Sequence, residues 1–291
     1  MRSAVFEAYI DPARLYPEIW RLCLGIGVIV LFYAGIFSLM LVAAYPVLGP
    51  LNYFGWLMGL SAPNTPAQTL FVLATFLGMG VGVLIAAPAL HYREPGSLFG
   101  PLRETTRGFF TALLAIVPVY AVLVAVGWLL SPPEANMEIG QWLRLLPVAL
   151  LLVLIQTSSE ELLFRGYLQQ QLAARFAARV IWMGLPALIF AGLHYNRLAG
   201  PNAWFIMAVA LAYALAAADL TERSGSLGMA MGWHFANNCS SILLVSLKGT
   251  ITGLALYVTP YDMADMTTAP LAVGLDILVV LVIWRLLRAL I

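Results

Sequence analysis

Long apolar segments with few charged residues dominate this chain of 291 residues. A helix needs about 20 mostly apolar residues to cross a bilayer. Eight segments approach or meet that length, over residues 22–47, 67–90, 109–131, 144–173, 180–195, 203–220, 227–247 and 270–290. Only 10% of the residues are charged and 62% are hydrophobic, whereas soluble domains average about 25% and about 45–50%. The sequence therefore predicts an all-α, polytopic membrane helix bundle of about eight helices, forming a single membrane domain over residues 1–291.

The distribution of positive charge predicts the orientation of this bundle. Cytoplasmic loops are enriched in Lys and Arg. Arginines gather in the N-terminal segment, in the loops after the second, fourth and sixth apolar segments, and at the C-terminal end. The alternate loops carry few positive charges. An even number of spans with both termini in the cytoplasm fits this pattern.

The first 21 residues have the pattern of an amphipathic helix. We expect Phe6, Ile10, Leu15 and Trp20 to lie at the membrane surface while polar residues face water. Membrane lipid is thus an expected partner. Nucleic acid is not, because no basic patch is large enough and the chain has a single lysine, Lys248.

Three of the apolar segments contain clusters of polar side chains. An ionisable group inside a span costs about 2.5–3.5 kcal/mol on insertion scales, so such a group is by default a candidate for function. The cluster members are Glu160, Glu161 and Arg165 in the fourth segment, His194 in the fifth, and His234, Asn237 and Asn238 in the seventh. Asp276 in the eighth segment is also ionisable, but the sequence assigns it no role.

Helical geometry sorts the charged residues of the fourth segment. Glu161 and Arg165 are four residues apart, so they share a helix face and are expected to pair as a structural element. Glu160 is rotated by about 100° from Glu161, so it points elsewhere and needs a partner on another helix or in a water-filled cavity.

The fifth and seventh segments also place their polar side chains on one face. His194 shares a face with Phe190, and His234 shares a face with Asn238. A bundle would turn these faces inward. Counted along straight helices, however, Glu160 falls near the middle of the membrane, His194 nearer the outer face and His234 nearer the cytoplasm. Their convergence requires a tilt, a kink at Pro186 or a different boundary for the fifth span.

These side chains together suit amide hydrolysis. A carboxylate beside a buried water acts as a general base, and an imidazole on the far side of the water orients it. A histidine and an asparagine one turn apart can both donate to one oxygen, as an oxyanion hole requires. The pattern therefore favours hydrolysis without a covalent intermediate.

Other interpretations fit the same residues. Glu160, His194 and His234 could bind zinc as a catalytic site, although no His-Glu-x-x-His helix is present. The chain could instead be a non-catalytic scaffold or a bacteriocin-immunity protein that keeps the polar residues for shape. Intramembrane charges also line transport paths, but the sequence has no inverted repeat and no pair of broken helices.

Three motifs resemble those of the CAAX protease and bacteriocin-processing family, which includes the eukaryotic endopeptidase that cleaves prenylated CAAX proteins. Glu-Glu-x-x-x-Arg is present at 160–165, Phe-x-x-x-His at 190–194, and His-x-x-x-Asn at 234–238. The three motifs occur in the family's order, and the matched core covers residues 144–245.

The resemblance implies a role for each motif residue. Glu160 would activate the water, His194 would assist it, and His234 with Asn238 would stabilise the oxyanion. Glu161 and Arg165 would hold the shape of the site.

The resemblance also implies where and on what the protein works. It implies a CAAX-type intramembrane endopeptidase without a cofactor, acting on a peptide or lipidated protein. The site would open to the cytoplasm of a bacterial or archaeal membrane.

Overall fold

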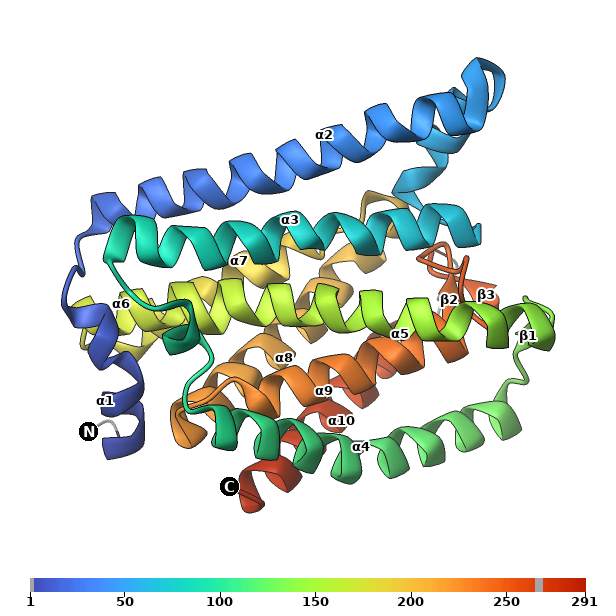
Figure 1. The fold of residues 1–291 in the computed structure, drawn as a ribbon. Helices are drawn as coiled ribbons and strands as arrows, with labels where there is room; N and C mark the ends of the chain where they lie inside the picture. The colour runs from blue at the N-terminus through green and yellow to red at the C-terminus, as the bar shows by residue number, and fades with distance from the viewer. Residues whose placement is uncertain (1–2, 265–268) are drawn as a thin grey trace.

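The computed structural model describes residues 3–264 and 269–291 and is a bundle of helices that run roughly along one direction (Figure 1). The helices are α1 (Ala4–Ile10), α2 (Ile19–Met58), α3 (Pro66–His91), α4 (Leu102–Leu130), α5 (Ile139–Glu161), α6 (Gln170–Arg175), α7 (Leu185–Leu193), α8 (Ala203–Ser224), α9 (Gly228–Asn238) and α10 (Ala269–Ala289). Each of the eight predicted segments coincides with one or two of these helices. The predicted all-α membrane bundle is thereby confirmed.

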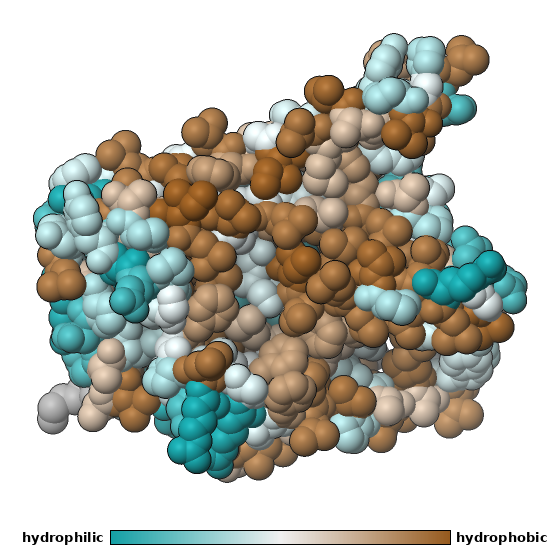
Figure 2. Space-filling model, viewed as in Figure 1, coloured by the Kyte–Doolittle hydropathy of each residue, from teal (hydrophilic) through white to brown (hydrophobic). Residues whose placement is uncertain are grey.

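Five helical stretches among the described residues are long and apolar enough to cross a membrane. They are Ile19–Ser61, Pro66–His91, Leu102–Leu130, Ile139–Arg175 and Arg197–Ser224. Hydrophobic surface covers the sides of these helices, and hydrophilic residues gather towards the ends (Figure 2). The chain is an integral membrane protein.

The total of eight spans stays a prediction, because the helical stretch Val180–Leu193 and the helix α9 are shorter than a membrane span. Both termini lie at the same end of the bundle (Figure 1). An even number of crossings requires this arrangement, while the side of the membrane on which that end lies also stays a prediction.

Segments of π-helix border the three helices that carry the motifs. Leu162–Gln169 joins α5 to α6, Val180–Gly184 leads into α7, and Cys239–Leu244 extends α9. Such wider turns are rare and occur frequently at functional sites. The sequence did not predict them.

The helix α2 is longer than predicted because it continues past a kink. Gly49 has a φ of 73°, and Pro46 and Pro50 lie on either side of it. A proline removes a backbone hydrogen bond and bends a helix, and glycine adopts a positive φ without steric cost. The predicted span therefore ended near the kink, whereas helical backbone continues to Met58.

A small sheet lies at the end of the bundle opposite the termini (Figure 1). Its strands are β1 (Glu134–Ala135), β2 (Val245–Lys248) and β3 (Tyr257–Asp262), in the order β1-β3-β2. β1 pairs with β3 antiparallel and β2 pairs with β3 parallel. The sequence treated most of these residues as loops, and the seventh apolar segment ends in β2 instead of continuing as a helix to residue 247.

Glycines allow α9 to pack directly on the backbone of α4. A Cβ added to Gly232 would lie 2.4 Å from the carbonyl oxygen of Phe109, and one added to Gly228 would lie 2.2 Å from that of Thr105. Small residues at such spacing let membrane helices approach closely. This contact holds α9, and with it His234, at a fixed depth in the bundle.

The N-terminal segment differs in part from its prediction; its residues 1–2 lie outside the described residues. Phe6 and Ile10 are fully buried, and the ring of Phe6 lies 5.1 Å from that of Trp182. These two side chains therefore pack against the protein and not against a membrane surface. Leu15 and Trp20 are exposed, as expected of interfacial residues.

Candidate active site

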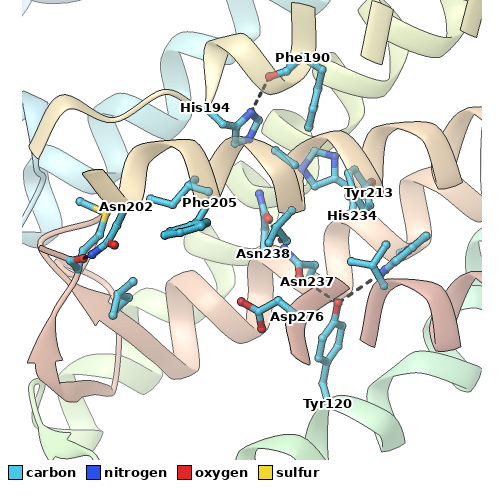
Figure 3. A pocket seen from close by; sticks show the side chains of 17 residues that line it. Tyr120, Phe190, His194, Asn202, Phe205, Tyr213, His234, Asn237, Asn238 and Asp276 are labelled. Atoms are coloured by element: carbon cyan, nitrogen blue, oxygen red, sulfur yellow. Dashed lines mark hydrogen bonds between the residues drawn. The ribbon is translucent and has the colours of Figure 1, made fainter. Parts of the chain in front are cut away.

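A cavity of about 300 Å³ lies among α4, α7, α8, α9 and α10, and Glu160 on α5 is not one of its described lining residues (Figure 3). His194, His234 and Asn238 all line it. The three predicted residues thus share one hollow although they come from α9 and from the end of α7. Most of its remaining lining is aromatic or aliphatic, as is usual for a site that binds an apolar ligand.

Glu161 anchors His234. Its Oε1 accepts hydrogen bonds from His234 Nδ1 at 2.8 Å, from Arg165 Nη1 at 3.0 Å and from Tyr213 Oη at 3.1 Å. Because an ionised carboxylate only accepts, Nδ1 of His234 must carry the hydrogen. The bond therefore fixes the ring orientation and directs Nε2 away from Glu161.

Glu160 faces the other nitrogen of the same imidazole. Its Oε2 lies 3.4 Å from His234 Nε2, and its side chain is only 13% exposed. This oxygen is buried and makes no hydrogen bond with the described residues. The predicted partner on another helix is therefore His234, and the oxygen retains capacity to accept a proton.

His194 is held by the backbone of its own helix. It is the residue directly after α7, and its Nδ1–H donates to the carbonyl oxygen of Phe190 at 2.8 Å. Nε2 is then the unprotonated nitrogen of a neutral ring. Phe190 lies between the polar groups, with ring centroids 4.5 Å from His194 and 6.2 Å from His234. No hydrogen bond or ion pair joins Glu160 to His194 in the described part of the chain.

A chain of hydrogen bonds orients Asn238. Its Nδ2 donates to Gln156 Oε1 at 2.8 Å, and its Oδ1 accepts from Asn237 Nδ2 at 3.1 Å. Asn237 Oδ1 in turn accepts from Tyr120 Oη at 2.9 Å. An amide nitrogen has two hydrogens, so one hydrogen of Asn238 stays available for a ligand. Asn237 positions its neighbour Asn238 through this hydrogen bond.

The positions of Glu160 and His194 relative to the turn between their helices bear on the expected difference in depth. Glu160 lies 15 residues before Arg175, and His194 lies 15 residues after Arg179. Both are therefore a similar number of residues from the same turn between helices, along stretches that include π-helical turns as well as α-helix. Pro186 lies in the first turn of α7, where its missing N–H is tolerated without a kink. The short fifth helix thus favours a similar depth for these two residues.

The zinc alternative needs Glu160, His194 and His234 around one point. Among residues 3–264 and 269–291, no group of three His, Cys, Asp or Glu side chains is placed to hold a metal ion.

Several residues of the site were not singled out by the sequence. Tyr120 and Tyr213 contact it from α4 and α8, within ordinary apolar segments, and nothing in the sequence distinguishes them. Gln156 lies one turn before Glu160 at the start of the polar interruption of the fourth segment. That spacing could have identified it.

The cavity extends towards the sheet end of the bundle. Asn202, Leu247 and Met263 line it there, in the loop before α8, in β2 and just after β3. In the predicted topology this end lies outside the cytoplasm. The position of the cavity thus gives no support to the expected cytoplasmic opening.

The fold and the site together define an integral membrane protein in which polar groups from three helices meet beside a largely apolar cavity. Residues 142–240 match the Rce1-like family, described as type II CAAX prenyl endopeptidase Rce1-like. This match covers about a third of the chain and confirms the resemblance predicted from the three motifs.

One curated relative and the solved structures were also compared with the chain. The chain is 26% identical over 155 residues to a protein of Bacillus subtilis (strain 168) described as "Uncharacterized protein YyaK". The alignment covers 52% of this chain and 50% of that protein, so the chain spans about half the length of the relative. No solved structure matches the chain.

Proposed function

We propose that the chain is an intramembrane endopeptidase that hydrolyses a peptide bond in a membrane-associated or lipidated peptide or protein. The observation that carries this proposal is the meeting of Glu160 and His234, with His194 and Asn238 lining the adjoining cavity. The family that residues 142–240 match supports the reaction class.

In the proposed reaction Glu160 is the general base. It takes a proton from a water molecule while the water oxygen attacks the carbonyl carbon of the scissile bond. His194 Nε2, the free acceptor of a neutral ring, orients that water. Glu160 then passes the proton to the leaving nitrogen as the C–N bond breaks. A general base of this kind contributes about 10²–10⁴-fold to a rate.

His234 and Asn238 stabilise the oxyanion in this proposal. Asn238 offers its free amide hydrogen. His234 offers Nε2–H in the form of its ring that carries a hydrogen on both nitrogens, with Nδ1–H held by Glu161. Donors held in advance by Glu161 and Gln156 need no rearrangement as the charge develops, which is the condition for strong electrostatic catalysis.

Glu160→Gln tests the proposal because it removes the base and keeps the shape. We expect cleavage to fall at least about 100-fold, with unchanged chromatographic behaviour and thermal unfolding. The measurement is peptide cleavage in proteoliposomes, with substrates first trapped on the Glu160→Gln protein and identified by mass spectrometry. Glu134→Gln, an exposed Glu outside the site, is the matched control. Cleavage by Glu160→Gln at the parent rate would refute the mechanism.

We also propose that the reaction needs no metal. Treatment with EDTA should leave cleavage unchanged, whereas a loss of activity restored by added zinc would favour the metal alternative. If the parent protein cleaves no substrate and Glu160→Gln retains the cellular phenotype, a scaffold or immunity role is the better explanation.

A further inference from the structure

Asp276 is an exposed carboxylate of α10, in the eighth predicted span, that the proposed reaction does not use. It lies in α10 and lines the cavity together with both histidines of the site. Figure 3 shows its carboxylate beside Tyr120 and Asn237, with Asn238 between it and His194. Asp276 makes no hydrogen bond or ion pair with the described residues. Because a charged group in a predicted span is costly, the lack of a partner for Asp276 among the described residues requires an explanation.

Besides Asp276, the titratable side chains among the described lining residues of this cavity are His194, His234, Tyr120 and Tyr213. None of its described lining residues is Lys or Arg. Arg165, the nearest arginine of the site, is 2% exposed and is bound to Glu161. Tyr120, which lies beside Asp276, donates its hydroxyl hydrogen to Asn237. Asp276 therefore has no Lys or Arg partner among the described residues that line the hollow.

The walls around Asp276 suit the stem of a long cationic side chain. Phe205, Val209 and Val280 line the same cavity. Aliphatic stems of Lys and Arg pack on such surfaces while the charged head binds a polar group, and aromatic rings attract cations. The volume of about 300 Å³ is at the small end of ligand sites, and fits one or two side chains.

We propose that Asp276 is a specificity residue that binds a cationic group of the substrate, a Lys or Arg side chain or a free α-amine, near the bond to be cleaved. This inference rests on the proposed function, since it assigns a chemical class to the substrate of the same site. The paired charges would offset the cost of Asp276 in the membrane, and an anionic group at that position would be rejected.

The test measures binding separately from cleavage. A set of labelled apolar peptides carries Lys, norleucine or Glu at one position, and that position is moved along the peptide. Each peptide is titrated against Glu160→Gln protein in detergent. We expect the Lys peptide to bind at least about tenfold more tightly than the norleucine peptide. Adding Asp276→Asn should reduce that ratio to below about twofold, and Asp276→Lys should favour the Glu peptide. Asp11→Asn, which changes an exposed Asp outside the cavity, should keep the ratio.

Each outcome decides one of the two proposals. If the three peptides bind equally at every position, or if none binds, the inference about Asp276 is wrong. If the peptides bind with charge selectivity but the parent protein cleaves none of them, the proposed protease function fails and the inference stands. If cleavage occurs without charge selectivity in either assay, the function stands and Asp276 has another role.

Discussion

Glu161 is the residue on which the contacts of the candidate site converge. Its sequence spacing correctly indicates a pair with Arg165, whose Nη1 lies 3.0 Å from its carboxylate. The same oxygen also holds His234, 73 residues further along the chain. Glu161 therefore connects the stability of the site to the orientation of an imidazole, a role that the pairing alone did not suggest.

Arg165→Ala should strongly destabilise the protein. Arg165 and Glu161 are 2% and 0% exposed, and removal of one partner leaves a buried charge without compensation. Such a loss costs about 3–5 kcal/mol, and thermal unfolding in detergent measures it.

Arg179→Ala is the matched control for this change. Arg179 also pairs with acidic residues, but its own side chain is 56% exposed, so the expected loss is about 1 kcal/mol or less. Equal losses for the two variants would show that the Glu161–Arg165 pair has no special structural role.

Close packing between elements places the site, and the pair α4–α9 is the clearest case. The glycines Gly228 and Gly232 are four residues apart, and a third glycine, Gly108, lies on α4 with its added Cβ 3.0 Å from the backbone of Met229. Tyr120 on α4 also bonds to Asn237 on α9. The depth of His234 thus depends on a contact between backbones.

Gly232→Ala should separate these two helices. The added Cβ would lie 2.4 Å from the Phe109 carbonyl oxygen, and overpacking of this kind costs about 1–3 kcal/mol. We expect a lower unfolding temperature together with reduced cleavage, because His234 is only two residues away.

Gly127→Ala, on the exposed part of α4, provides the comparison. Nothing lies within 4 Å of its added Cβ, so replacing Gly in a helix should be neutral or stabilise by about 0.5–1 kcal/mol. A Gly232→Ala protein as stable as the parent would contradict the proposed packing.

The whole molecule has two distinct ends, one with both termini and one with the small sheet (Figure 1). The cavity extends towards the sheet end, where Asn202 and Met263 line it. Which end faces the cytoplasm therefore decides from which side a substrate can enter, and the distribution of arginines predicts that the sheet end faces outwards.

Labelling of single cysteines in intact cells tests this topology. In a background with Cys23 and Cys239 replaced by Ala, a membrane-impermeant maleimide should label Glu134→Cys at the sheet end. It should label Arg103→Cys, at the start of α4, only after the membrane is permeabilised. The reverse pattern would mean that the sheet faces the cytoplasm and that the predicted orientation is wrong.

The sequence alone determined that the chain lies in a lipid bilayer, where its helices run and which residues form the motifs. In a bilayer each backbone group must be satisfied within its own helix or a closed barrel, so apolar length predicts structure locally. Spacing of one turn likewise predicts that Glu161 meets Arg165 and that His234 lies beside Asn238.

Only the tertiary structure decided which of these local faces meet. The contacts of His234 with Glu160 and Glu161, the approach of Tyr213 and the placement of Asp276 in the cavity join residues far apart in the sequence. They depend on how closely the helices approach and where each helix begins, as the glycines of α9 and the short helix α7 illustrate. Packing between elements, and not the periodicity of any one element, sets these distances.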